Sequence, residues 1–296
     1  MIVKMADGLT DNQKRFFEDN GYLIIEDFLS LKDVDALENE HYKLIEEMNP
    51  AEHSAVFSPT HQLDDDYFLN SGDKIRFFFE EDAVNEKGDL VVDKQKSCNK
   101  IGHALHWLNP EFKRVTFSDK VQGIARTLGF VRPSVVQSMV IFKQPGIGGV
   151  VNPHQDLTYL WNDPPKLIGY WIALEDTTLE NGCLWFIPGS HKDGLRNDFR
   201  MVRNPDRKSV NEPLLKHTAK QPEFEESKFV PGPVKKGTLV LIDGYVVHKS
   251  HKNTSKNSRH IYTFHVTEQH ETKWSKDNWL QPTENLGFPC LYDEKW

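Results

Sequence analysis

Between residues 134 and 267 the chain consists largely of short runs of β-branched and aromatic residues separated by turn-forming residues. Pro188-Gly189-Ser190 and Pro231-Gly232-Pro233 are clear breaks of this kind. Several short strands at modest spacing are typical of a β-sandwich or jelly roll. The fold class is therefore predicted to be mainly β with flanking helices. The predicted strands are 134–143, 168–175, 183–187, 237–242, 245–248 and 259–267.

Helix-forming patterns precede this β-rich region. Thr10 and Gln13 have the spacing of a capping box, in which each side chain bonds the other residue's backbone N–H. They predict a helix that ends near Gly21, because glycine readily takes the left-handed conformation of a helix end. Tyr22–Ile25 follows as a predicted strand.

Two further helices are predicted before residue 130. Ser30 caps the first of them, whose apolar residues recur at helical spacing up to Met48. Met48 is therefore expected in the core and not on a contact surface. Residues 110–129 predict the second helix, with Ser118 as an internal cap and Gly129 as the stop.

A hairpin is predicted between these helices. Ile75–Glu80 and residues 89–92 are the two strands, and residues 85–88 form the turn between them. The glycine of this turn permits a positive φ.

The segment 192–228 is long, polar and without strong periodicity. Between residues 192 and 220 it carries eight Lys and Arg against four Asp and Glu, which makes it locally positive. Two interpretations remain open: a solvated loop, or a lid that attracts an anionic substrate.

Composition excludes several classes of partner. The chain has 296 residues and a formal net charge of −8, so no global basic field gathers nucleic acid or anionic membranes. No apolar run approaches the roughly 18 residues that a membrane span needs. A small-molecule substrate is the expected partner. The sequence does not specify the oligomeric state, and a monomer is favoured.

The cysteines and the chain ends predict a location. Cys98, Cys183 and Cys290 are odd in number and widely spaced, which fits reduced thiols in an intracellular protein. The first residues lack the apolar stretch of a signal peptide and the Arg-rich character of a transit peptide. The last residues are not a peroxisomal address. A cytoplasmic location is therefore expected.

His154, Asp156 and His248 are the candidate metal ligands. Two imidazoles and one carboxylate form the 2-His-1-carboxylate pattern, which leaves three coordination positions open and suits Fe(II). On an extended segment residues i and i+2 point to the same side, so one strand end aims His154 and Asp156 at one ion. A structural zinc site would instead be closed and often rich in thiolates.

Ser250 and Arg259 follow His248 by two and eleven residues. A strand that leaves the turn-rich run between them would bring Arg259 back beside the metal strands. The planar guanidinium makes two parallel hydrogen bonds to a carboxylate, and the Ser250 hydroxyl adds a third donor. The alternative is that Arg259 is a surface cation of the turn, beside Lys252 and Lys256.

Other catalytic patterns are missing from the sequence. It contains no G-x-S-x-G elbow, no phosphate-binding G-x-x-x-x-G-K-[ST] loop and no G-x-G-x-x-G after a strand. The glycine-rich residues 146–149 are better explained as a flexible turn that leads into the metal strand. His103 and His106 have no third ligand at matching spacing, so we expect them to line or pack the interior.

Four longer runs accompany the three candidate ligands: 71–80 (SGDKIRFFFE), 99–106 (NKIGHALH), 153–156 (PHQD) and 179–191 (LENGCLWFIPGSH). Runs of this length are far more specific than the three ligands alone. On these residues the chain resembles the phytanoyl-CoA hydroxylase family of Fe(II)- and 2-oxoglutarate-dependent dioxygenases. The resemblance covers nearly the whole chain, from Phe16 to Pro282.

The resemblance implies a double-stranded β-helix core of the jelly-roll, cupin-like type. It also implies that Fe(II), 2-oxoglutarate as cosubstrate and O₂ are used. Iron would be held by His154, Asp156 and His248, and the distal carboxylate of the cosubstrate by Arg259 and Ser250.

The family pattern further places a lysine, a methionine and a tryptophan around the cosubstrate, and these roles fall on Lys100, Met139 and Trp171. The alternation of residues along 134–143 and 168–175 agrees that Met139 and Trp171 point into a barrel. Taken without the resemblance, both residues fit a core role. Gln137 and Gln155 are placed to hydrogen-bond within the same pocket.

The resemblance implies one catalytic domain over residues 1–296. Residues 1–130 would be a helical and hairpin support region, 131–270 the double-stranded β-helix, and 271–296 a C-terminal extension. The implied reaction hydroxylates a small molecule, such as an acyl- or carboxylate-bearing one, and releases succinate and CO₂. Two alternatives remain: a cupin-like metal-binding protein with non-oxidative activity, and a 2-oxoglutarate-binding protein without turnover.

Overall fold

The computed structural model describes residues 8–52, 56–57, 66–85, 87, 89–208 and 212–293. The expectations for the first seven residues, for the last three and for two residues of the predicted 85–88 turn lie outside the described residues.

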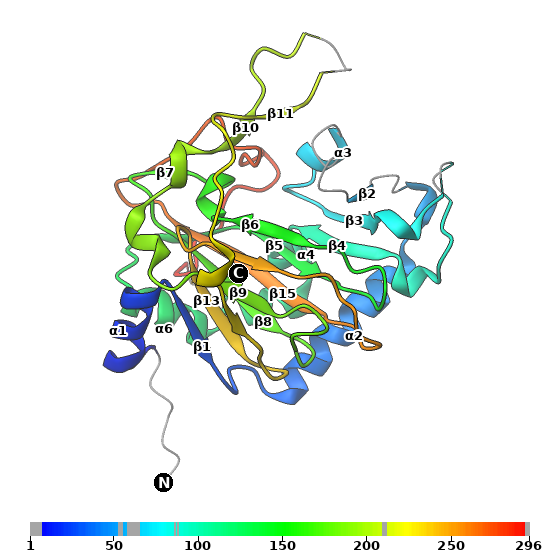
Figure 1. The fold of residues 1–296 in the computed structure, drawn as a ribbon, viewed down its shortest axis with the longest axis horizontal. Helices are drawn as coiled ribbons and strands as arrows, with labels where there is room; N and C mark the ends of the chain where they lie inside the picture. Colours follow the sequence, from blue (N-terminus) through cyan, green and yellow to red (C-terminus); the bar gives the residue numbers. More distant parts are fainter. Residues whose placement is uncertain are drawn as a thin grey trace.

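Two antiparallel sheets face each other across the centre of the described chain (Figure 1). The larger has eight strands in the order β1-β13-β8-β15-β5-β4-β3-β2, and the smaller has four in the order β12-β9-β14-β6. Within the larger sheet only the short β2 runs parallel to its neighbour. Four strands of the larger sheet, β13, β8, β15 and β5, lie opposite the whole smaller sheet. Successive strands of the roll alternate between these two sets of four, except that β9 and β12 both lie in the smaller sheet, which is the winding of a jelly roll.

The jelly roll begins at β5 and ends at β15. Most of the predicted strands are confirmed, with bounds shifted by a few residues. The predicted strand 245–248 is displaced toward the C-terminus, because β14 begins at His248 and the residues before it form a turn. The strands of the roll are β5 (Pro133–Ile141), β6 (Val151–His154), β8 (Leu167–Ala173), β9 (Leu184–Phe186), β12 (Val230–Gly232), β13 (Leu239–Asp243), β14 (His248–Ser250) and β15 (Ile261–Glu268).

Helices cover the outer face of the larger sheet. Side chains such as Leu37 and Ile124 pack there against Tyr170 and Phe264. In Figure 1 helices α1, α2 and α6 occupy the lower part of the view. The helices of the described chain are α1 (Asp11–Asn20), α2 (Leu31–Glu47), α3 (Asp66–Leu69), α4 (Leu105–Leu108), α5 (Pro110–Thr116) and α6 (Asp119–Thr127). Of these, α3 packs elsewhere, because its Phe68 belongs to a cluster with Phe78 and Trp279.

The predicted helix ends before residue 50 are confirmed. Thr10 and Gln13 form the capping box of α1, and Gly21 closes the helix with a φ of 78°. The Ser30 hydroxyl accepts the N–H of Asp33 at the start of α2. Met48 is 5% exposed and belongs to the core cluster under the helices.

The predicted helix over 110–129 is two helices. Ser118 takes an extended conformation (φ −66°, ψ 154°) between α5 and α6, so it is the N-cap residue of α6. Its side chain makes no capping bond. Gly129 has a φ of 70°, as expected of a residue just past a helix end.

The predicted hairpin partner of β3 (Ile75–Glu80) is wrong. β3 pairs antiparallel with β4 (Cys98–His103), and β4 pairs with β5. The residues expected to pair with β3 make only an isolated bridge, between Val84 and Leu90. β4 is buried along its whole length, whereas Asp89 and Val91 are exposed, so burial of both faces favours β4 as the partner.

The polar segment 192–228 is partly ordered. β10 (Met201–Arg203) and β11 (Leu215–His217) form a two-stranded sheet, which projects at the top of Figure 1. Arg203 ties this hairpin to the C-terminal segment, because its guanidinium donates to the carbonyls of Asn278 and Trp279. Both interpretations of the segment 192–228, a solvated loop and a lid, stay predictions. The remaining strands are β1 (Tyr22–Ile25), β2 (Val56–Phe57), β7 (Asn162–Asp163) and β16 (Lys273–Trp274).

The cysteines agree with the expectation of reduced thiols. Cys98, Cys183 and Cys290 are all buried and free. Across the described part of the chain, no helix combines the length and the apolar character that crossing a membrane requires.

Candidate metal centre

His154, Asp156 and His248 meet at the end of the smaller sheet. His154 is the last residue of β6 and lies directly opposite His248, the first residue of β14. Gln155 keeps the chain extended (φ −117°, ψ 135°) before Asp156 starts a short 3₁₀ turn. The expected i and i+2 arrangement of His154 and Asp156 is therefore present.

One oxygen of Asp156 faces both imidazoles. Oδ1 lies 3.6 Å from Nε2 of His154 and 3.7 Å from Nε2 of His248. One ligand atom from each of the three residues lies within 4.8 Å of the others. In an octahedral ion with bonds of roughly 2.1 Å, neighbouring ligand atoms are roughly 3 Å apart, so a small inward movement accommodates it. Among the described residues, no other group of three His, Cys, Asp or Glu side chains meets this requirement.

Backbone carbonyls orient both imidazoles. Nδ1 of His154 donates to the carbonyl of Asn152 (2.8 Å), and Nδ1 of His248 donates to that of Val246 (3.1 Å). Since a neutral imidazole carries one proton, these bonds leave both Nε2 atoms unprotonated and directed at the centre. Both rings are thus in the tautomer that binds a metal.

The charges of the three groups are strongly coupled. Burial opposes ionisation of Asp156, but His265 and His248 outweigh it and hold the carboxyl pKa well below its usual range. Burial and the neighbouring His154 lower the pKa of His248 to about 4. Burial also opposes protonation of His154, yet Asp156 raises the pKa of that imidazole. A buried carboxylate ringed by imidazoles is suited to a divalent cation.

Arg259 lies inside the roll and not on a surface turn. It is 2% exposed, and its backbone pairs with that of Lys143 just before β15 begins. Its Nε has no hydrogen-bond partner among the described residues. Burial lowers the pKa of this guanidinium to about 10, so it remains a cation at neutral pH. A buried cation with an unpartnered N–H is the environment in which an anionic ligand binds.

Met139 and Trp171 lie in one row across the larger sheet. Both are directly opposite Thr263 of β15, on the β5 and β8 sides respectively. Trp171 belongs to the apolar cluster between the two sheets, and its ring centre is 5.7 Å from the guanidinium carbon of Arg259. Their predicted contact with a cosubstrate stays a prediction.

Ser250 and Lys100 are both buried. Ser250 ends β14, opposite Val151 of β6. Lys100 lies on β4, with its ammonium 5.1 Å and 5.0 Å from the ring centres of Phe68 and Phe78. Burial lowers the pKa of Lys100 to about 7. Their roles toward a cosubstrate also stay predictions.

The Gln155 side chain is engaged by the protein itself. Its amide nitrogen donates to the carbonyls of Gly194 (2.8 Å) and Tyr245 (2.6 Å). Its amide oxygen accepts the backbone N–H of Arg196 at 2.9 Å. These bonds connect the metal-binding turn to two loops, and a direct contact of Gln155 with a cofactor stays a prediction.

His265 was not predicted from the sequence as a site residue. Its Nε2 lies 3.2 Å from Oδ2 of Asp156, the oxygen that faces away from the other two histidines. The alternation of residues along the predicted strand 259–267 indicates the direction of this side chain. Residues 259, 261, 263 and 265 alternate onto one face, so a strand that aims Arg259 inward aims His265 inward as well.

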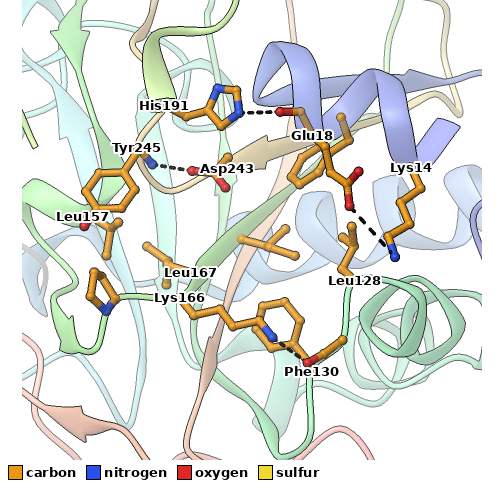
Figure 2. A pocket seen from close by; sticks show the side chains of 14 residues that line it. Lys14, Glu18, Leu128, Phe130, Leu157, Lys166, Leu167, His191, Asp243 and Tyr245 are labelled. Atoms are coloured by element: carbon orange, nitrogen blue, oxygen red, sulfur yellow. Dashed lines mark hydrogen bonds and ion pairs between the residues drawn. The ribbon is translucent and has the colours of Figure 1, made fainter. Parts of the chain in front are cut away.

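A cavity lies beside Leu157, the residue that follows Asp156. It has a volume of about 380 Å³ and is lined by α1, by β8 and by Asp243. Figure 2 shows Asp243 within it, where its carboxylate accepts the N–H of Tyr245 and His191 donates to the carbonyl of Glu18. Neither Arg259 nor any of the three metal ligands lines this cavity. It is therefore separate from the candidate centre.

A family model described as Phytanoyl-CoA dioxygenase (PhyH) matches residues 17–261. The chain belongs to this family. Among its relatives, Phytanoyl-CoA dioxygenase domain-containing protein 1 of Danio rerio is 52% identical over 97% of this chain and 99% of its own length. The protein of the same name from Bos taurus is 48% identical over 96% of this chain and 99% of its own length.

Solved structures share the fold of this phytanoyl-CoA dioxygenase family member. The non-heme alpha ketoglutarate dependent carbocyclase SnoK from nogalamycin biosynthesis superposes with a TM-score of 0.61 at 18% identity, covering 96% of this chain and 98% of its own. EctD from S. alaskensis, solved with 2-oxoglutarate and 5-hydroxyectoine, gives a TM-score of 0.58 at 19% identity, covering 90% and 79%. The fold is thus the double-stranded β-helix of 2-oxoglutarate-dependent dioxygenases, with flanking helices and a candidate His-Asp-His facial triad.

Proposed function

We propose that this protein is an Fe(II)- and 2-oxoglutarate-dependent dioxygenase that hydroxylates a small molecule. The observation that carries the proposal is the pairing of an open 2-His-1-carboxylate group with a buried arginine whose Nε has no hydrogen-bond partner among the described residues. The three metal ligands alone are compatible with several metal-dependent reactions. A buried arginine in the same roll favours a reaction that uses a dicarboxylate cosubstrate, because the guanidinium binds a carboxylate.

The three ligands would hold Fe(II) on one side of the ion. His154 and His248 present unprotonated Nε2 atoms, and Asp156 presents Oδ1. When bound, Fe(II), 2-oxoglutarate and O₂ together supply the oxidation, in which the cosubstrate becomes succinate and CO₂ and a substrate C–H bond is hydroxylated. The protein's own task is to orient the reactants and exclude water.

Arg259 would receive the distal carboxylate of 2-oxoglutarate. Its guanidinium is already desolvated and lies against Trp171, so little ordering accompanies binding. Ser250, Lys100 and Met139 complete the proposed cosubstrate pocket. Lys100 is suited to a carboxylate, because an anion beside it would restore the charged form that burial disfavours.

The substrate would meet an aromatic wall beside the metal. The rings of Phe78 and Trp279 both contact that of Phe68, and the three belong to one apolar cluster with Leu157, the residue after Asp156. Tyr159 lies 6.0 Å from the ring of His154. We propose a substrate with an apolar body, such as an acyl compound, because apolar and aromatic side chains predominate in this wall.

Succinate formation tests the proposal directly. Metal-free protein is loaded anaerobically with Fe(II) and 2-oxoglutarate, O₂ is admitted, and succinate is quantified. We expect succinate from the wild type, none above background from His154→Ala, and wild-type amounts from His270→Ala, which alters an exposed histidine outside the site.

Two other outcomes correspond to the alternative functions. If the loaded wild type binds 2-oxoglutarate but forms no succinate, the protein is a 2-oxoglutarate-binding protein without turnover. If it fails to bind 2-oxoglutarate and shows a metal-dependent hydrolysis that Arg259→Ala leaves unchanged, it is a cupin-like metalloprotein with non-oxidative activity. Either result would reject the dioxygenase.

A further inference from the structure

The two oxygens of Asp156 have different surroundings. Oδ1 faces the Nε2 atoms of His154 and His248, where a metal would lie. Oδ2 lies 3.2 Å from Nε2 of His265, which comes from the opposite, larger sheet. The carboxylate is therefore held from both sides of the roll, by the metal-binding strands and by β15.

Gln137 holds the far side of the His265 ring. Its amide nitrogen lies 3.1 Å from Nδ1 of His265, and the two residues are direct neighbours on β5 and β15. If the amide donates to Nδ1, the single ring proton is on Nε2. Nε2 of His265 is then the donor to Oδ2 of Asp156.

The backbone around this contact makes room for it. The pairing of β5 with β15 slips by one residue just beside His265, a β-bulge that re-aims the neighbouring side chains. On the other side of His265 lies Gly169 of β8. A Cβ at this position would be 3.3 Å from Oδ2 of Asp156 and 3.6 Å from Cδ2 of His265. A glycine thus leaves the space in which the carboxylate and the imidazole meet.

We propose that His265 is a positioning residue that makes Asp156 a one-oxygen metal ligand. Its N–H occupies Oδ2, and Oδ1 alone remains for the ion. Without this bond the carboxylate is free to turn and bind through both oxygens, which takes up a position that the cosubstrate or O₂ needs. Gln137 fixes the imidazole, as the outer partner of a ligand-orienting group does in other metal sites.

The inference rests on the proposed function, so its test measures metal binding without turnover. Co(II) serves as a redox-stable probe, because its visible absorption responds to the number and geometry of its ligands. Metal-free wild type, His265→Leu, His265→Gln and Thr267→Val are titrated with Co(II), and the thermal unfolding of each metal-free form is recorded. Thr267→Val is the matched control, since it alters a buried residue of the same strand outside the site.

His265→Leu is expected to weaken Co(II) binding by about 10- to 100-fold and to change the Co(II) spectrum, since the orientation of the ligand is lost. His265→Gln keeps an N–H at a similar reach and is expected to restore most of the affinity and the wild-type spectrum. Thr267→Val should bind Co(II) as the wild type does. Gln137→Leu should shift affinity in the same direction as His265→Leu but less, which keeps the test decisive even if His265→Leu does not fold.

Equal affinity and equal spectra for wild type and His265→Leu would overturn this inference and leave the proposed function standing. A His265→Gln variant as weak as His265→Leu would also overturn it, because the N–H would then be irrelevant. A wild type that binds no Co(II) would overturn the proposed function and this inference together.

Discussion

The guanidinium carbon of Arg259 lies 5.7 Å from the centre of the Trp171 ring, and both side chains are buried inside the roll. The ring holds the cation in place without neutralising it, because an aromatic face offers partial negative charge but no hydrogen-bond acceptor. The unpartnered Nε therefore stays available to a ligand.

Replacing Arg259 should separate ligand binding from stability. Arg259→Leu should lose about 3–5 kcal/mol of 2-oxoglutarate affinity, or more than 100-fold, because a buried charge pair can no longer form. The metal-free variant should unfold near the wild-type temperature, because removal of the desolvated guanidinium offsets the loss of its attraction to Glu175 and Glu80. Anaerobic 2-oxoglutarate titrations and thermal unfolding measure the two effects. Arg259→Lys, which keeps the charge without the fork, should bind better than Arg259→Leu; equal affinity in all three proteins would contradict the assignment.

Metal binding should raise the stability of the folded protein. Mn(II) accepts the same nitrogen and oxygen ligands and does not turn over. At a free concentration of 100 times its Kd it should add about 2.7 kcal/mol, and a chelator should reverse the gain. Thermal unfolding with and without Mn(II) measures the shift. The shift should vanish in His154→Ala and persist in His270→Ala, and the prediction fails if His154→Ala is stabilised like the wild type.

A methyl group at position 169 should disturb the metal-binding carboxylate. Its Cβ would lie 3.3 Å from Oδ2 of Asp156, which forces the carboxylate or His265 to shift. Gly169→Ala should therefore weaken Mn(II) binding by about tenfold, the lower end of the effect of losing an outer-shell contact. Gly287→Ala is the control, because a Cβ there meets nothing within 4 Å. Isothermal titration compares the two variants, and equal affinities would show that the space beside Gly169 is not needed.

Glu80 should make folding stability depend on pH. Burial raises the pKa of this 3% exposed carboxyl to about 7 from its ordinary value of 4.5. Below pH 4.5 both folded and unfolded states are protonated. Between pH 4.5 and about 7 the unfolded chain releases the proton first, so stability falls as pH rises and then levels off.

The Glu80→Gln variant isolates this effect. Over that pH interval the unfolding free energy of the wild type should fall by about 3 kcal/mol relative to Glu80→Gln. Urea unfolding at pH 4, 5, 6, 7 and 8 gives the two curves. Parallel curves would show that Glu80 ionises in the folded protein as it does in the unfolded chain.

Features that depend on neighbouring residues were predictable from the sequence. The capping box of Thr10 and Gln13, the Gly21 helix end and the alternating strands around Met139 and Trp171 all follow from local backbone preferences. The metal ligands were predictable because His154 and Asp156 are two residues apart on an extended segment. The division of the chain into domains, its cytoplasmic location and its monomeric state stay predictions.

Features that depend on pairing between distant strands were not predictable in the same way. β3 was expected to pair with a nearby segment, but it pairs with β4, which is buried on both faces. The inward direction of His265 follows from the alternation along its strand, but its contact with Asp156 was recognisable only once the two were known to lie together. Burial and cross-strand neighbours decide both cases, and neither is written in a short stretch of sequence.

The extension of the larger sheet by β4 and β3 separates the metal ligands from part of the proposed substrate wall. His154 and His248 lie on strands of the roll and Asp156 follows one of them, whereas Phe78 and Lys100 lie on strands added at its edge. Varying Phe78 on β3 would therefore alter the proposed aromatic wall while the metal ligands and the proposed cosubstrate residues stay in place, which makes this position the natural place to engineer selectivity.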